Sequence, residues 1–92
     1  MIGEQLKTRL SARLRRIEGQ VAGIRRMIEE DRYCIDILNQ TSAVVSALRR
    51  VEDGVMENHL NTCVSEAMRS DDPAEKIEKT TEIMDVISRL RR

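Results

Sequence analysis

An apolar stripe at helical spacing runs through the first third of the chain and is its strongest constraint on folding. Apolar side chains recur every three or four residues, at Leu6, Leu10, Leu14, Ile17, Val21, Ile24 and Ile28. That spacing places them on one face of a helix. It predicts a single amphipathic helix from near Gly3 to about Glu30. Gly19 and Gly23, four residues apart within it, predict close approach of another helix backbone.

Polar breaks divide the remaining chain into two more predicted helices. The second runs from an N-cap at Asp31 to about Arg69. Its apolar seam comprises Val44, Leu48, Val51 and Val55, continued by Leu60, Val64 and Ala67. The third begins where Asp72 precedes Pro73, with Glu75 placed to close a capping box. We therefore expect an all-α, three-helix subunit in which residues 1–92 form one domain.

The core of this subunit is predicted to be small, and a second copy is expected to complete it. The chain has 92 residues, no Phe or Trp, and Tyr33 as its one aromatic residue. A domain of this size is marginal for a self-sufficient core, and the most common partner of a small soluble subunit is a copy of itself. No apolar run is long enough for a membrane span and no signal peptide is visible, so a cytoplasmic location is expected.

The charges are distributed unevenly although they sum to zero. The first 28 residues hold seven cations against two acids, and residues 51–92 hold six cations against ten acids. A solvated, salt-bridged helix face is one explanation of the basic segment, and a polyanionic partner is the other. Arginine outnumbers lysine there, which favours phosphate because a guanidinium binds phosphate through two hydrogen bonds.

Two cysteines and a single histidine are the residues that point to a metal. His59 and Cys63 are four residues apart, which places both on one face of a helix, one turn apart. Two thiolates and an imidazole form a set that selects Cu(I) or Zn(II) over Mg or Ca. A cysteine by itself is often a small buried hydrophobe, and a lone histidine a satisfied polar group. The combination with Cys34 favours a metal site.

One helix cannot bring the three ligands together. Cys34 precedes His59 by 25 residues, or roughly 37 Å of straight helix at about 1.5 Å per residue. Gly54 alone is too weak a break for a hairpin. Two antiparallel copies would place Cys34 of one beside His59 and Cys63 of the other, at two symmetric sites. Three ligands fit trigonal Cu(I), whereas Zn(II) normally takes a fourth and Ni(II) or Co(II) would want more nitrogen.

Three segments of the chain resemble the copper-sensing repressor (CsoR) family of bacterial regulators. They are Arg13–Ile24, Asp31–Leu38 and His59–Val64. The resemblance covers nearly the whole chain. It implies an antiparallel dimer that assembles into a dimer-of-dimers tetramer. It also implies repression of a metal-efflux or detoxification operon, with operator DNA released when the sensor site is filled.

The resemblance also assigns roles to single residues. The copper ligands of the family match Cys34, His59 and Cys63. Copper-responsive members place a tyrosine and a glutamate around the histidine. Tyr33 matches the tyrosine, and Glu82 is the expected glutamate, with Glu78 as the alternative. A carboxylate or phenol that accepts the second ring N–H fixes the orientation of a ligating imidazole.

Other branches of the family respond to other signals. Nickel or cobalt sensors have an additional histidine near the N-terminus, and the formaldehyde branch pairs its cysteine with an N-terminal proline. Neither residue is present in the first 30 positions here. The persulfide branch lacks the histidine. Reactive sulfur nevertheless remains an alternative signal for this chain, because it could link Cys34 of one chain to Cys63 of another. A metal-buffering helical bundle without a DNA role is the third alternative.

DNA contact is expected from a basic helical face, because no helix-turn-helix is recognisable. The residues expected to form this face are Arg13, Arg15, Arg16 and Arg50, supported by Lys7, Arg9 and Arg49. When such residues contact phosphates, the affinity for DNA falls steeply as the salt concentration rises. An enzyme is not expected, because the sequence shows no nucleophile–base pair and no phosphate loop. The leading hypothesis is a Cu(I)-responsive repressor that binds operator DNA.

Overall fold

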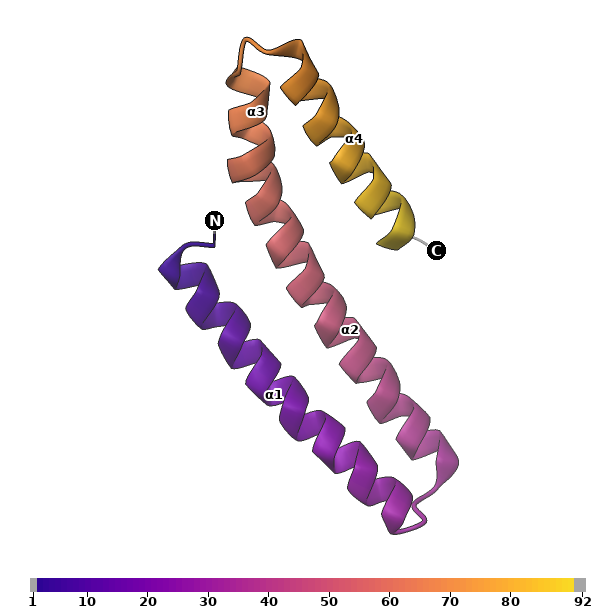
Figure 1. Ribbon diagram of the computed structural model, residues 1–92. Coiled ribbons are helices and arrows are strands. Elements are labelled where there is room, and N and C mark those ends of the chain that lie inside the picture. The colour runs from indigo at the N-terminus through magenta and orange to yellow at the C-terminus, as the bar shows by residue number, and fades with distance from the viewer. Residues whose placement is uncertain (1, 91–92) are drawn as a thin grey trace. The chain divides into compact units, whose positions relative to one another are not determined.

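The computed structural model describes residues 2–90 and is helical throughout, with no strand in that range (Figure 1). The elements are α1 (Glu4–Glu29), α2 (Cys34–His59), the π-helix η1 (Leu60–Val64), α3 (Ser65–Arg69) and α4 (Pro73–Leu90). The predicted three-helix, all-α subunit is confirmed, because α2, η1 and α3 follow one another without a break and end at the predicted residue. The chain forms two compact units, Ile2–Met56 and Glu57–Arg92, of which residues 57–90 are described in the second.

In the first unit α1 and α2 lie side by side and antiparallel (Figure 1). Leu10 and Ile17 of the predicted stripe are buried, together with Val44 of α2. The helices approach closely at Gly54, where an added Cβ would lie 3.2 Å from Leu10 Cδ2. The small residue therefore lets the helices pack closely there, and α2 remains helical through it.

The predicted close approach at Gly19 and Gly23 is not made within the subunit. Among the described residues, no atom lies within 4 Å of a Cβ added at either glycine. Both positions are therefore open on the surface of a single chain, and the glycine that the fold uses for close packing is the one in α2.

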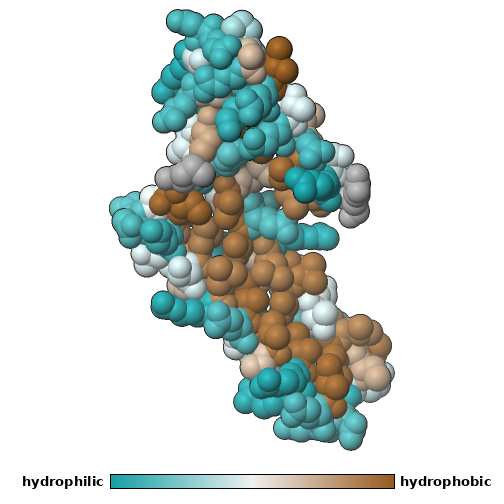
Figure 2. All heavy atoms as spheres, in the orientation of Figure 1, coloured by the Kyte–Doolittle hydropathy of each residue, from teal (hydrophilic) through white to brown (hydrophobic). Residues whose placement is uncertain are grey.

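Much of the apolar stripe is exposed. On α1 the exposed members are Leu14, Val21 and Ile28, each seven residues from the next. On α2 they are Ile35, Leu38, Val45, Leu48 and Val55. Figure 2 shows the resulting band of hydrophobic surface over the α1–α2 unit. No helix in residues 2–90 has the length and apolar character needed to cross a bilayer.

The turn between α1 and α2 corrects the predicted role of Asp31. Asp31 is not an N-cap of α2, because it follows the end of α1 in the left-handed conformation, with φ 55°. The Arg32 N–H donates to the Met27 carbonyl at 2.9 Å, and the Asp31 N–H donates to Ile28 at 3.2 Å. This pair of bonds is a Schellman motif, which closes a helix C-terminus. The residue directly before α2 is Tyr33, whose carbonyl accepts the Ile37 N–H at 3.2 Å.

The start of α4 follows the prediction in part. Asp72 Oδ1 accepts the Ala74 N–H at 3.0 Å, and Pro73 is the first helical residue. The reciprocal half of the expected capping box is different, because the Asp72 N–H donates to Ser70 Oγ at 3.1 Å rather than to Glu75. In this second unit Ala67 of α3 and Ile83 of α4 are buried, so α4 folds back onto α3 and positions its polar side chains near the end of α2.

Candidate metal centre and basic groove

The segment that carries Cys63 is a π-helix, which the sequence pattern did not predict. The Ser65 N–H donates to the Leu60 carbonyl, five residues earlier, so the turn is one residue wider than in an α-helix. His59 ends α2 and Cys63 lies inside this wider turn. The two side chains are therefore not at a regular α-helical spacing. Single π turns occur frequently at functional sites.

His59 faces a carboxylate from α4. Its Nε2 lies 3.7 Å from Glu82 Oε1, and its side chain is 27% exposed. Glu82 Oε2 lies 3.7 Å from Lys79 Nζ, one turn earlier on α4. Within residues 2–90 the Glu78 side chain has no ion pair or hydrogen bond. Of the two glutamates considered from the sequence, the structure brings Glu82 to the imidazole.

Cys63 is half-buried and has a hydroxyl beside it. Thr62 Oγ1 lies 3.6 Å from Cys63 Sγ, and the same hydroxyl donates to the Asn58 carbonyl at 2.8 Å. Sequence reasoning did not single out Thr62. The one signal for Thr62 in the sequence is its position directly before Cys63, a candidate metal ligand.

Cys34 is exposed and is the first residue of α2, whereas His59 is the last. Tyr33 precedes Cys34 and is 68% exposed. Within residues 2–90 of one chain, no three His, Cys, Asp or Glu side chains are close enough together to hold a metal ion. One subunit therefore supplies the imidazole, its carboxylate and one thiol at one end of α2, and the other thiol with the phenol at the opposite end.

The donor chemistry fits a soft metal ion. Thiolate sulfur and imidazole nitrogen are ligands for Cu(I) and Zn(II), and Ca or Mg would require oxygen. Because Nε2 of His59 faces Glu82, Nδ1 is the ring nitrogen left for coordination. The residues that would hold the ion are Cys34, His59 and Cys63.

Three of the residues expected to contact DNA come together in a hollow. Arg13 and Arg16 of α1 and Arg50 of α2 line a groove of about 380 Å³, and Gln20 and Ser46 line it with them. Lys7, Arg9, Arg15 and Arg49 do not line this groove. Lys7 instead pairs with Glu4 at 3.3 Å. Gln20 and Ser46 were not predicted, although Gln20 follows Arg13 and Arg16 at seven and four residues, on the same helix face.

A family model described as metal-sensitive transcriptional repressor matches residues 6–89 of the chain. The copper-sensing transcriptional repressor RicR of Mycobacterium tuberculosis is 55% identical over 69 residues, which cover 75% of this chain and 72% of that protein.

Solved structures agree in fold. A crystal structure of the copper-sensing repressor CsoR with Cu(I) from Geobacillus thermodenitrificans matches with a TM-score of 0.88 and 41% identity, over 100% of this chain and 95% of that chain. A variant of the formaldehyde-responsive regulator FrmR from Salmonella enterica serovar Typhimurium matches with a TM-score of 0.75 and 28% identity, over 96% and 97%. The chain belongs to the family of metal-sensitive transcriptional repressors.

Proposed function

We propose that this family member is a Cu(I)-responsive repressor, which binds operator DNA in the cytoplasm and releases it when Cu(I) binds between two subunits. The copper-sensing names of its relatives support the choice of metal. The observation that carries the proposal is the His59 imidazole, whose Nε2 faces Glu82 at 3.7 Å, one π turn before the thiol of Cys63. A ligating histidine in proteins usually has such a carboxylate partner.

The third ligand is Cys34 of a second copy. Cys34 and His59 are the two ends of the 26-residue α2, which at about 1.5 Å per residue separates them by roughly 37 Å. An antiparallel pair of α2 helices would place each Cys34 beside the partner's end of α2. Two symmetric sites would result, one at each end of the pair.

The face of α2 supports such a pairing. At about 100° per residue, both ligand positions of α2 and all of its exposed apolar residues except Ile35 fall within a sector about 100° wide. Those residues are Cys34, Leu38, Val45, Leu48, Val55 and His59. Thr41 and Glu52 are the polar members of the same sector. An apolar surface of this extent on a small subunit is typical of a contact between proteins, and here it runs between the two candidate ligand positions.

Glu82 would connect metal binding to the fold of the second unit. The present separation of 3.7 Å is longer than an N–H···O hydrogen bond of about 2.7 to 3.2 Å. Coordination through Nδ1 favours the tautomer with hydrogen on Nε2, which strengthens its attraction to Glu82. Movement of α4 toward His59 would then follow, with Tyr33 of the second copy as a further partner. Couplings of this kind are typically about 1 to 3 kcal/mol and must be reciprocal between metal and DNA.

The DNA-binding form is proposed to be a tetramer made of two dimers. It would present the basic residues of α1 and α2, with Arg13, Arg16 and Arg50 at the groove and Arg15, Arg9, Lys7 and Arg49 around it. Because α1 is strongly basic and most of the remaining acids lie after residue 50, the DNA is expected to approach from the α1 side.

The direct test is fluorescence anisotropy with labelled DNA from upstream of the chain's own gene, with and without Cu(I), in reductant and at fixed salt. We expect DNA affinity to fall by about five- to 150-fold with Cu(I). His59→Ala should bind DNA equally well and respond to Cu(I) much less. Equal affinity of the native protein with and without Cu(I) would reject the proposal.

A thiol-based signal is the second candidate, because Cys34 is an exposed thiol. Polysulfide treatment followed by intact mass spectrometry distinguishes the two signals. A reactive-sulfur sensor would give a full-stoichiometry interchain link between Cys34 and Cys63 together with DNA release. A copper sensor would release DNA with Cu(I) and retain it under polysulfide.

A further inference from the structure

We propose that the hollow between α1 and α2 is a pocket for a single phosphate group, and that it binds inorganic phosphate even without DNA. We call it the arginine pocket and define it by Arg13, Arg16, Gln20, Ser46 and Arg50. Its use by DNA rests on the proposed function, whereas its affinity for free phosphate does not.

The shape of the pocket follows from helix periodicity. Arg13, Arg16 and Gln20 are three, four and seven residues apart in pairs, so they share one face of α1. The opposite wall comes from α2, where Ala43 and Ala47 leave space between the helices, and Arg50 stands one turn further on. The resulting space of about 380 Å³ admits a tetrahedral anion together with the ends of the guanidinium groups.

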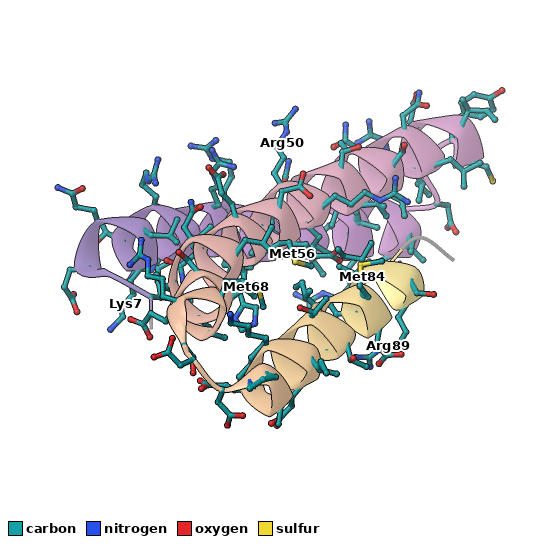
Figure 3. All side chains as sticks on the ribbon, turned by 90° about the horizontal axis from the view of Figure 1, so that it is seen from above. Lys7, Arg50, Met56, Met68, Met84 and Arg89 are labelled. Carbon is teal, nitrogen blue, oxygen red and sulfur yellow. The ribbon has the colours of Figure 1, made fainter. Side chains whose placement is uncertain are left out.

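The charge of the pocket is uncompensated. None of its three arginines has an ion-pair partner among residues 2–90, and no carboxylate lines the pocket. By contrast, Arg25 of the same helix pairs with Glu29 at 3.6 Å. Figure 3 shows the Arg50 side chain extending outward from α2. Three cations that line one hollow without a counter-ion attract an anion strongly.

A second hollow in the same unit has a different balance of charged residues. It measures about 280 Å³ and is lined by Arg26, Arg32 and Gln40, but also by Glu30. One carboxylate against two guanidinium groups repels a phosphate and offers the arginines an internal partner. The arginine pocket has three cations and no acid, so it is the stronger anion site of the two.

The polar atoms beside the arginines match a phosphate as well. Gln20 Oε1 is buried and has no hydrogen-bond partner among the described residues. Such an acceptor is costly unless a donor reaches it. An anion would draw the guanidinium groups inward, where each has N–H donors to spare for Gln20 after bonding the anion. Ser46 adds one hydroxyl donor. Phosphate has enough acceptor oxygens for several guanidinium forks, which a carboxylate lacks.

The free-phosphate test uses NMR of the reduced, metal-free protein without DNA, titrated with inorganic phosphate while chloride keeps the ionic strength constant. We expect saturable shifts at the amides of Gln20 and Ser46 and at the arginine Nε–H groups. Arg16→Ala should abolish saturation, and Arg25→Ala, which removes a paired arginine from the same helix, should leave it unchanged. Non-saturable shifts, or equal shifts in Arg16→Ala, would overturn the pocket.

The DNA test uses the salt dependence of binding. Each phosphate contact contributes about 0.9 to the slope of log K against log salt. Because the arginines share one phosphate, Arg13→Ala combined with Arg16→Ala should lower the slope by no more than about one contact for each subunit that engages the DNA, which is the same limit as for either single change. A decrease of about two contacts for each engaged subunit in the double variant would overturn the single-phosphate assignment. Failure of the native protein to bind DNA would reject the proposed function, and the phosphate titration would still decide the pocket.

Discussion

His59 Nε2 lies 3.7 Å from Glu82 Oε1, and the two residues come from helices that are separated by the π turn and by α3. The relationship places a carboxylate of α4 against the one imidazole of the chain. A change at the metal ligand would therefore be felt directly by α4, which gives the proposed sensor its first coupling step.

Glu82→Gln should uncouple Cu(I) binding from DNA release. The amide keeps the size of the side chain and removes the charge that attracts the Nε2 hydrogen. We expect Cu(I) affinity to fall by no more than about 10- to 100-fold, and the coupling to shrink by about 1 to 2 kcal/mol. Competition with a Cu(I) chelator and DNA anisotropy measure the two quantities. Glu78→Gln is the matched control, and loss of coupling in that variant alone would contradict the assignment.

Mixed dimers test whether the site is shared between copies. Cys34→Ser and His59→Ala should each bind Cu(I) weakly as pure proteins, because every site lacks a ligand. In a mixed dimer, one site combines Cys34 of one chain with His59 and Cys63 of the other and is intact. Co-expression with two affinity tags isolates that species, and we expect one tightly bound Cu(I) per dimer. No recovery of binding would contradict an intersubunit site.

Negative charges introduced on the exposed face of α2 should prevent two subunits from pairing. Val45 and Leu48 are exposed on the sector that runs between the ligand positions. Val45→Glu with Leu48→Glu places like charges opposite one another in an antiparallel pair and should give monomers by sedimentation velocity. Asn39→Glu, about 150° around the helix from the centre of the sector, is the control and should sediment as the native protein does. A native-sized assembly in the double variant would place the interface elsewhere.

Asp31 should respond to substitution in a direction set by its backbone. Its φ of 55° is strained for alanine and ordinary for glycine. We expect Asp31→Ala to lower the free energy of unfolding by about 1 kcal/mol and Asp31→Gly to leave it equal or raise it. Urea denaturation followed by circular dichroism at one fixed protein concentration gives the comparison. Equal stability of the alanine and glycine variants would argue against the Schellman turn.

Local sequence signals predicted the helices well and failed where one residue type serves two roles. Asp72 and Pro73 begin α4 as predicted, because a cap needs only neighbouring residues. Asp31 was assigned to the wrong helix, because aspartate favours both N-caps and left-handed turns. The π turn at Leu60–Val64 has no local signature in the sequence, so the spacing of His59 and Cys63 was interpreted as α-helical.

The number of helices, their approximate ends and the chemistry of the candidate ligands could all be predicted from the amino-acid sequence. These follow from hydrogen bonding within a few residues and from side-chain identity. That Glu82 rather than Glu78 faces His59 could not be predicted in this way, since both glutamates lie on one face of α4, one turn apart, and the packing of α4 selects between them. The packing of α1 against α2 likewise brings Arg13, Arg16 and Arg50 to one hollow. Such choices depend on how helices distant in sequence pack, and periodicity gives the face of a helix but not what lies opposite it.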